Sequence, residues 1–382
     1  MTNELINQGK LSDMDDTLLN AIAGRIAGSG EGAVISRTFE PIGPKAGNFV
    51  TDGVFRVEGE LETKRGVLPW SVVVKIIRPD PVRDDAAHYN YWRREAFAYQ
   101  SGRLEHLPGG LRAPACYAVE EKPSGAIWLW LEDLGENHGA LWGERQYALA
   151  AHTLGRFQAA YLLGEPMPDE PWLNRAWLRS WIRECRKYQP WPPIGGSSSL
   201  RDRRIRQIVE RFERIYGLVD EWVAELAGLP RVLSHQDYYE NNLMYVHESG
   251  KAGQIVALDW QFASLSSAGE DLGRYYGLSI SRGAVPLDRF GEYRQLFFQS
   301  YMEGMREAGW SGDERQIRWT FLVACAVRSV WEVPKLYSKS LERLENLHKG
   351  AVQDEAMERL IQATETQLDM AEEAERLRTA IR

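Results

Sequence analysis

The sequence predicts an α+β protein with a small N-terminal antiparallel sheet and a larger, mainly helical C-terminal part. Two observations support this prediction. Residues 33–77 alternate short β-rich runs with glycine and proline, which is typical of strands joined by turns. After Gly135 the pattern changes to long segments with apolar residues at helical spacing. The 382 residues suffice for one large or two modest domains, and we place the boundary near Asp133, between residues 1–132 and residues 133–382.

The N-terminal part is expected to hold five strands and one helix. The β-rich runs predict strands over residues 34–39, 52–61, 69–77, 113–121 and 126–133. We expect the first three to be consecutive and antiparallel. A helix is predicted from about Asp84 to Leu104, so the small sheet would carry one helix.

The C-terminal part is expected to be helical with one exception. Apolar periodicity predicts helices over residues 147–163, 200–226, 289–308 and 351–377. The last of these is charged and favours an exposed terminal helix, or one that pairs with a partner. Residues 166–199 are expected to form an irregular segment between helices. Residues 231–262 contain two apolar strand-like runs around a polar turn, and such a polar insertion with strand ends is where we expect chemistry.

Composition narrows the class of protein. Lys and Arg total 46 against 54 for Asp and Glu, a formal charge of −8, which argues against a general nucleic-acid or anionic-membrane binder. No stretch approaches the roughly 20 apolar residues of a membrane span, and residues 1–10 lack the order of a secretory signal, so we expect a cytoplasmic protein. Three cysteines, Cys116, Cys185 and Cys325, are an odd number without metal-ligand spacing, which argues against a disulfide framework and a zinc ribbon.

The most informative motif is His235-Gln236-Asp237, with Asn242 after four further residues and Asp259 at the end of the next apolar run. A magnesium ion that holds nucleotide phosphates prefers hard oxygen ligands and leaves room for water. The Asn242 amide oxygen and the Asp259 carboxylate would supply such ligands. Asp237 would then face an acceptor hydroxyl, orient it and take its proton. The motif therefore indicates phosphoryl transfer from a magnesium-bound nucleotide.

Two other interpretations of this motif remain. Asp237 and Asn242 could simply stabilise a turn, because both residue types favour turns through local hydrogen bonds. A metal-hydrolase site built on His235 and Asp237 is a minor alternative, because the further histidines that such sites use are missing. His235 itself, beside an apolar strand, is expected to be a hydrogen-bonded strut rather than a base.

Lys75 and Glu95 form a second constellation. Lys75 stands in the run VVVKII, which is apolar on both faces of the predicted strand and leaves the ammonium group in need of an anionic partner. Glu95 lies within an apolar stripe at helical spacing and needs a partner too. The two would make an ion pair that aims the ammonium group at phosphate oxygens, or a purely structural pair.

Two further segments carry weaker signals. The loop that joins the first two strands, residues 43–48, includes Gly47 and Asn48, and its backbone N–H groups could cover phosphates or simply form a hairpin turn. Residues 127–135 form an apolar strand that runs into Glu132 and Asp133, where a free strand edge could offer backbone bonds to a nucleobase.

In this order, these features resemble the aminoglycoside phosphotransferase and choline kinase group, relatives of protein kinases that phosphorylate small molecules from ATP. The likeness covers about residues 37–277. It is most specific in SHQDYYENNLMY (234–245) and IVALDWQFASLSSAGEDLGRY (255–275). The resemblance implies a two-lobed protein-kinase-like fold, with residues 1–132 as the nucleotide-binding lobe and residues 133–382 as the catalytic and substrate-binding lobe.

The resemblance also implies residue roles and cofactors. Asp237 would be the catalytic aspartate, Lys75 the phosphate-binding lysine and Glu95 its helix partner. The cofactors would be ATP and Mg²⁺, with Asn242 and Asp259 as metal ligands. The remaining residues that it places in or around the site are the hinge Leu131, Glu132 and Asp133, and the structural brace Asp271.

The sequence does not identify the acceptor molecule. The sequence departs from the resembled pattern at Gln236, where glycine is usual, and at Tyr238-Tyr239-Glu240. We expect a small-molecule hydroxyl acceptor, such as an aminoglycoside or other antibiotic, an amino alcohol or a sugar, and a monomer or homodimer. Most tryptophans should be core, although Trp260 or Trp331 could stack on the acceptor. Acidic side chains at Glu240, Glu270 and Glu332 could hold a cationic acceptor.

The alternative is a nucleotide-binding regulator without turnover, a pseudokinase. It would apply if the unusual residues at 238–240 blocked the acceptor side. A protein substrate is less favoured, because DWQ replaces the protein-kinase DFG and an APE-like segment is missing.

Overall fold

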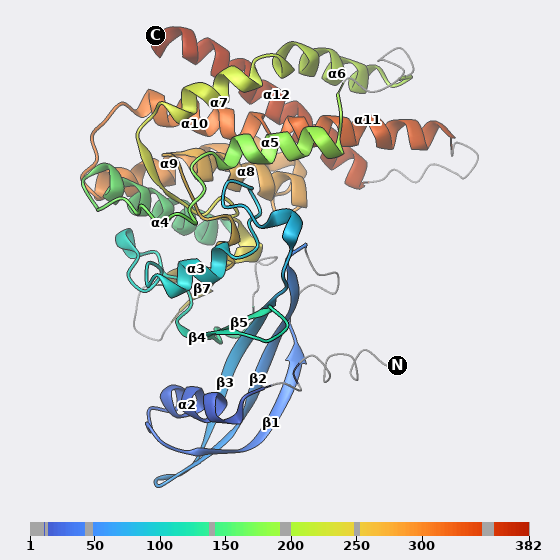
Figure 1. Cartoon of the computed structure of the whole chain (residues 1–382). Coiled ribbons are helices and arrows are strands. Elements are labelled where there is room, and N and C mark those ends of the chain that lie inside the picture. The colour runs from blue at the N-terminus through green and yellow to red at the C-terminus, as the bar shows by residue number, and fades with distance from the viewer. Residues whose placement is uncertain are drawn as a thin grey trace. The chain divides into compact units, whose positions relative to one another are not determined.

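The computed structural model describes residue 11 and residues 14–42, 49–136, 142–191, 200–247, 253–345 and 355–381 (Figure 1). They form two compact units. The first contains the residues up to Asp84, with Trp92–His106 and Ala113–Glu136; the second contains Asp85–Tyr91, Leu107–Arg112 and the residues that follow Glu136. The first unit is built around a sheet and the second is mainly helical, which confirms the α+β class. The functional division at residues 132 and 133 stays a prediction.

The sheet of the first unit has five antiparallel strands in the order β1-β2-β3-β5-β4. The strands are β1 (Ala33–Pro41), β2 (Thr51–Thr63), β3 (Gly66–Ile77), β4 (Cys116–Glu121) and β5 (Ile127–Glu132). All five predicted strands are confirmed, because β-branched and aromatic residues between turn residues specify each of them locally. The predicted phosphate loop, residues 43–48, lies outside the described residues.

One face of this sheet is covered by helix α2 (Asp16–Ile26), which was not predicted from the sequence (Figure 1). Asp15 caps the helix by accepting the backbone N–H group of Thr17 at 2.8 Å. The buried helix residues Leu19 and Ile22 share one core with alternate residues of β2, β3 and β5. In its described residues the first unit therefore carries the two helices α2 and α3, and the expectation of one was wrong.

The second helix, α3 (Arg94–Gln100), is much shorter than the predicted helix over residues 84–104. The backbone just before α3 forms hydrogen bonds with side chains instead of the hydrogen bonds of a helical turn. The Asn174 amide donates to the Ala87 carbonyl at 3.0 Å, and the Trp177 indole donates to the Tyr89 carbonyl at 3.0 Å. Because these carbonyl groups are engaged by residues about 90 positions away, local periodicity could not reveal the late start of the helix.

The second unit consists mainly of nine helices in its described part: α4 (Glu144–Leu162), α5 (Trp177–Tyr188), α6 (Arg203–Tyr216), α7 (Val219–Ala227), α8 (Glu270–Arg282), α9 (Phe290–Glu307), α10 (Glu314–Ala326), α11 (Ser329–Glu345) and α12 (Glu355–Ile381). Two predicted helices correspond closely to α4 and α9. The single helix predicted over residues 200–226 is two helices, which separate at Gly217, a poor helix former. Helix α5 lies within residues 166–199, which were expected to be irregular, so that prediction was wrong for residues 177–188. Residues 192–199 lie outside the described residues.

Helix α12 is packed rather than exposed, contrary to expectation. Its apolar residues, among them Leu368 and Ala371, are buried, and it contacts α6, α8, α10 and α11 (Figure 1). Its charges have partners in α6, where Arg204 binds Glu365 at 2.6 Å and Glu358 at 2.8 Å. The charged character of this segment reflects ion pairs with a neighbouring helix as well as solvent.

Two small antiparallel pairs complete the second unit. Strand β6 (Arg231–Ser234) pairs with β9 (Ser264–Ser267), and β7 (Leu243–Val246) pairs with β8 (Gln254–Ala257). They confirm the strand-like runs predicted around the polar motif.

Among the described residues, no helix has the length and apolar character of a membrane span. The three cysteines are free thiols.

Candidate active site

The loop between β6 and β7 carries the His-x-Asp motif, and His235 supports it from within. The His235 side chain is fully buried. Its Nδ1 accepts the backbone N–H group of Asp237 at 3.2 Å, and its Nε2 lies 2.8 Å from the Leu258 carbonyl oxygen. The imidazole must therefore carry its proton on Nε2 and donate it to that carbonyl. Both ring nitrogens hold backbone in place, which leaves His235 no nitrogen for a reacting group.

Asp271, in the first turn of α8, binds the same loop from the other side. Its two carboxylate oxygens accept the backbone N–H groups of Gln236 at 2.6 Å and His235 at 2.8 Å. The Gln158 amide donates to the same carboxylate at 3.1 Å. Burial raises the pKa of Asp271 to about 7, although its backbone hydrogen bonds work in the opposite direction. Asp271 is thus an internal support for the loop.

Gln236 adopts a left-handed backbone conformation with φ of 64°. This is the position at which the resembled pattern has glycine, and a left-handed conformation is costly for a residue with a Cβ atom. The side chain compensates by donating from Nε2 to the buried Glu270 carboxylate at 2.7 Å. The Gln236 carbonyl in turn accepts from Arg274 Nε at 2.5 Å.

Asp237 is the member of this loop whose carboxylate reaches the surface, with 21% of its side chain exposed. Asn242 Nδ2 donates to Asp237 Oδ2 at 2.8 Å and to the Asp237 carbonyl at 3.0 Å. Burial raises the pKa of Asp237, and the nearby Arg274 and Arg282 oppose that shift. The carboxylate is therefore oriented by its neighbours and still accessible to a small molecule.

The side chains of Asn242 and Asp259 offer the oxygen atoms that suit a magnesium ion. Because Asn242 Nδ2 points to Asp237, the amide oxygen is left as an acceptor that no donor of the described residues binds. The Asn242 carbonyl accepts the Leu258 N–H group at 2.7 Å, which ties Asn242 to the residue before Asp259. Asp259 has φ of 58°, and its charge adds to the effect of burial in raising the pKa of Asp237. One amide and one carboxylate leave room for water and phosphate oxygens, as magnesium requires.

Within the described residues, no cluster of three or more His, Cys, Asp or Glu side chains could hold a metal ion. A metal-hydrolase site of the kind considered for His235 and Asp237 would need such a cluster.

The predicted ion pair between Lys75 and Glu95 is present in the first unit. Lys75 Nζ lies 2.6 Å from Glu95 Oε2, with 8% of the lysine side chain and 0% of the glutamate side chain exposed. Lys75 stands on β3 opposite Val54 of β2 and Leu129 of β5, and its flanking residues Val74 and Ile76 face the core under α2. Gly47 and Asn48, the other predicted phosphate-binding residues of this unit, lie outside the described residues.

The segment predicted as an adenine hinge does not form a free strand edge, because β5 lies between β3 and β4. Leu131 pairs with both neighbouring strands. The Glu132 N–H group donates to the Ala115 carbonyl at 2.8 Å, and the Glu132 side chain accepts the Ala115 N–H group at 3.0 Å. A contact of Leu131, Glu132 or Asp133 with adenine stays a prediction.

Asp133 has a role within the first unit. Its carboxylate binds Arg56 at 2.8 Å and also accepts the Ser71 hydroxyl and the Gly135 N–H group. Hydrogen bonds from Arg56 and Ser71 outweigh the effect of burial and lower the pKa of Asp133. The Asp133 carboxylate is thus held by residues of the sheet, at the end of β5.

Sequence reasoning missed two arginines of α8 that lie near Asp237. Arg274 Nη2 is 3.9 Å from Asp237 Oδ1, and only 3% of the Arg274 side chain is exposed. Its guanidinium lies 4.2 Å from the ring centre of Trp177. Arg282 Nη1 donates to the Tyr239 hydroxyl at 2.8 Å. The signal was available for Arg274: a charged residue among small and apolar helix positions needs a partner, by the reasoning applied to Lys75.

The acidic residues considered for a cationic acceptor are buried and already bound. Glu240 accepts the Ser279 hydroxyl at 2.7 Å, and Glu332 binds Arg328 at 2.6 Å. Glu270 accepts the Gln236 amide, as described above. Trp260 is fully buried and donates to the Ala257 carbonyl at 2.9 Å, so it is a core residue. The expectation that most tryptophans are core holds for Trp222 as well.

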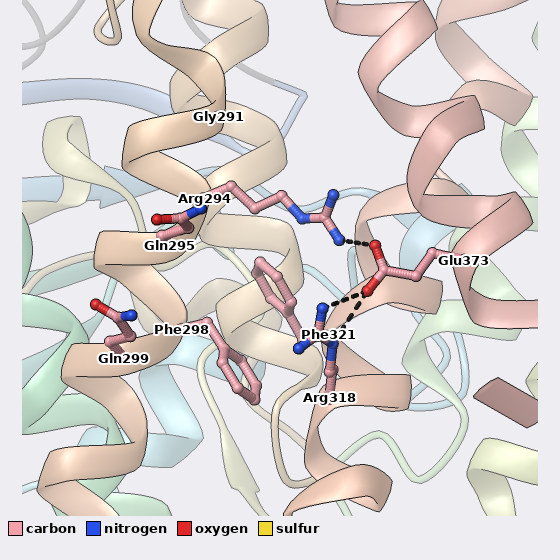
Figure 2. A pocket seen from close by; sticks show the side chains of 8 residues that line it. All are labelled: Gly291, Arg294, Gln295, Phe298, Gln299, Arg318, Phe321 and Glu373. Carbon is pink, nitrogen blue, oxygen red and sulfur yellow. Dashed lines mark hydrogen bonds and ion pairs between the residues drawn. The ribbon is translucent and has the colours of Figure 1, made fainter. Parts of the chain in front are cut away.

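A separate cavity of about 460 Å³ lies among α9, α10 and α12. Figure 2 shows Glu373 between Arg294 and Arg318, with Phe298 and Phe321 beside them. Arg318 Nη2 lies 2.6 Å from Glu373 Oε1, and Arg294 pairs with the other carboxylate oxygen. None of the predicted site residues lines this cavity, and its charged side chains pair with one another.

Comparison with known proteins identifies the class. The model of the phosphotransferase enzyme family matches residues 60–308. The chain belongs to this family and is an enzyme of the small-molecule kinase type. No curated protein sequence gave a significant match.

Two solved structures share the fold over almost the whole chain. An amicoumacin kinase in complex with AMP-PNP, Ca²⁺ and Ami is 13% identical, with a TM-score of 0.52 over 97% of this chain and 96% of that chain. A microcompartment-associated aminopropanol kinase is 12% identical, with a TM-score of 0.53 over 97% of each chain. At this identity the likeness shows a common kinase-like fold.

Proposed function

We propose that this phosphotransferase moves the γ-phosphoryl group of ATP to a hydroxyl group of a small molecule in the presence of Mg²⁺. The observation that carries the proposal is the arrangement around Asp237. Asn242 orients this partly exposed carboxylate with its amide nitrogen and turns its own oxygen away. Asp259 lies close enough to influence the Asp237 pKa. A base, an amide oxygen and a second carboxylate in one place meet the needs of phosphoryl transfer.

Asp237 would act on the acceptor. Its carboxylate would accept a hydrogen bond from the acceptor hydroxyl, orient the hydroxyl oxygen toward phosphorus and take the proton as transfer proceeds. Burial favours the neutral carboxyl, whereas Arg274 and Arg282 favour the charged form that a base requires.

Asn242 and Asp259 would hold the magnesium ion, which supplies neutralisation of charge on the phosphate oxygens. The hydrogen bond from Leu258 to the Asn242 carbonyl fixes the spacing between these two ligands.

Lys75 would bind phosphate oxygens through its ammonium group. Glu95 keeps that group charged and directed while leaving it other hydrogen-bond donors, because an ammonium group has three. Lys75 and Glu95 belong to the first unit, and Asp237, Asn242 and Asp259 to the second. Action of both sets on one nucleotide is part of the proposal.

Two of the three residues that suggested a silent regulator, Tyr238 and Glu240, point into the protein. Tyr238 is fully buried and donates its hydroxyl to the Ala150 carbonyl at 2.9 Å. Glu240 is buried and bound to Ser279. Side chains that are committed to the interior do not occupy an acceptor site, which supports turnover over a regulator.

A screen for ADP release tests the proposal. Magnesium-ATP would be supplied with acceptors from the aminoglycoside, macrolide, amino alcohol, sugar and hydroxy acid classes. We expect ADP release that depends on one acceptor class, stops when EDTA removes magnesium and yields a phosphorylated product by mass spectrometry. ATP binding without release on any acceptor would instead support a regulator.

A further inference from the structure

The charges beside Asp237 point to the class of acceptor. We infer that the acceptor alcohol carries an anionic group, a carboxylate or a phosphate, which Arg282 binds while Asp237 engages the hydroxyl. The inference rests on the proposed function and concerns the same site. Its basis is the arrangement of Arg282, Tyr239 and Arg274 around Asp237.

Arg282 is held in place by Tyr239 and forms no ion pair with the described residues. It is the last residue of α8, and its side chain is exposed. Its guanidinium stacks on Tyr239, 4.6 Å from the ring centre, while Nη1 donates to the hydroxyl of the same residue at 2.8 Å. No carboxylate in the described part of the chain lies within 4.0 Å of Arg282, whereas Arg204, Arg289 and Arg378 each bind two or more.

The orientation of Arg282 leaves hydrogen-bond donors for a ligand. Tyr239 engages Nη1 only, so Nε and Nη2 keep a fork geometry that matches the two oxygens of a carboxylate or phosphate. Arg282 is hydrogen-bonded to Tyr239, and Tyr239 follows Asp237 by two residues. An anion on Arg282 would therefore lie near the hydroxyl that Asp237 binds.

Arg274 adds a second positive charge behind Asp237. Burial and the neighbouring Arg328 lower the pKa of the Arg274 guanidinium to about 10, yet it remains charged at neutral pH. Its Nη1 is buried and has no hydrogen-bond partner among the described residues. Arg274 and Arg282 offset the charges of Asp237 and Asp259, and burial raises the pKa of the third nearby carboxylate, Glu240. An anionic alcohol beside a triphosphate needs such compensation.

The same surroundings disfavour a cationic acceptor. Glu240, Glu270 and Glu332 are each 2% or 3% exposed and bind side chains of the protein. An ammonium group would face Arg282 at this place and would have to displace internal hydrogen bonds to reach these carboxylates.

Acceptors of one size and different charge test the inference. We would measure kcat/KM with magnesium-ATP for glyceric acid, glycerol 3-phosphate, glycerol and 3-amino-1,2-propanediol, which share a three-carbon chain. A parallel series of gluconate, glucose 6-phosphate, sorbitol and glucamine covers larger acceptors. We expect an anionic member of one series to be preferred at least tenfold over its neutral member, with the amine least reactive. The carboxylate and phosphate members decide which anion is bound.

Variants connect that preference to Arg282. Arg282→Gln should lower the anionic-to-neutral ratio of kcat/KM at least tenfold, mainly through KM. Tyr239→Phe removes the hydroxyl that orients the guanidinium and should lower the ratio by a smaller factor. Arg318→Gln is the matched control, because it removes the same charge from an arginine of α10 that lines the separate cavity (Figure 2). We expect it to keep the wild-type ratio.

The outcomes separate the inference from the proposed function. Preference for the amines, or an unchanged ratio in Arg282→Gln, would overturn the inference while magnesium-dependent transfer still stood. If acceptors of every charge gave no phosphorylated product, the proposed function would fail first. An equal fall of the ratio in Arg282→Gln and Arg318→Gln would show a general effect of net charge and would also overturn the inference.

Discussion

The Asp271 carboxylate accepts the backbone N–H group of Gln236 at 2.6 Å, and through this bond the first turn of α8 supports the loop that presents Asp237. The second oxygen of the same carboxylate accepts the N–H group of His235. Because Gln236 has a left-handed backbone, the loop needs this external support to hold its shape. The position of Asp237 thus depends on a residue more than 30 positions later.

The buried Asp271 should make stability depend on pH. Its pKa of about 7 in the folded protein exceeds the value of about 3.9 expected in the unfolded chain. The folded state therefore binds the proton more tightly, so the contribution is fully present below pH 4 and is lost as the pH rises through about 7. The free energy of unfolding of the wild type, measured by urea at pH 5 to 8, should fall relative to that of Asp271→Asn as pH rises. A constant difference between the two proteins would contradict this assignment.

Removal of either partner of the Lys75–Glu95 pair should destabilise the first unit. Lys75→Met or Glu95→Gln leaves one buried charge without its counter-ion, which typically costs about 3–5 kcal/mol. The double variant should recover part of this loss in urea unfolding, because it leaves neither charge behind. Phosphoryl transfer should stay impaired in all three proteins, since the ammonium group or its orientation is missing. A double variant with wild-type kcat/KM for ATP would refute the proposed role of Lys75.

The left-handed backbone of Gln236 gives a test with two substitutions. Gln236→Ala and Gln236→Gly both remove the hydrogen bond to Glu270, so both should be less stable than the wild type by urea unfolding. The glycine variant should be more stable than the alanine variant by about 1 kcal/mol, because only glycine adopts this φ without strain. The reverse order would mean that the loop can relax to an ordinary conformation.

Asp133→Asn should lower stability by about 1–3 kcal/mol, because a buried hydrogen-bonded pair with Arg56 is broken. The matched control is Asp220→Asn, which breaks an ion pair with Arg186 in which 73% of the aspartate side chain is exposed. Exposed pairs contribute about 0–1 kcal/mol. Urea unfolding of both variants at pH 7 compares them directly. Equal losses in the free energy of unfolding would show that the Asp133–Arg56 pair stabilises the protein no more than a surface pair.

Local patterns predicted the parts of the site that lie close together in sequence. The alternation of VVVKII placed Lys75 on a strand without polar neighbours, and the helical stripe around Glu95 placed a carboxylate in the same situation. Each residue needed a partner of opposite charge, so these two local patterns were enough to predict the ion pair. The motif from His235 to Asn242 is likewise local, and the strands on either side were readable from their apolar runs.

Long-range contacts decided what the sequence could not reveal. The late start of α3 depends on side chains from residues 174–180, and the burial of α12 depends on charges in α6. The sequence shows that Arg274 needs a partner, but only the fold shows that Arg274 lies beside Asp237 and Arg282 beside Tyr239. A single sequence does not show which distant residues pair, so the residues around the acceptor could be identified only from the structure.

The most direct test of the account is the Asp237→Asn variant. Asparagine keeps the size of the side chain but cannot take the acceptor proton. In single-turnover experiments with magnesium-ATP and the best acceptor of the screen, phosphorylated product should form at least 1,000-fold more slowly, a loss of about 4 kcal/mol in transition-state stabilisation. Thermal unfolding and ATP binding should stay close to wild type. Product formation at the wild-type rate would contradict the central claim that Asp237 is the catalytic base.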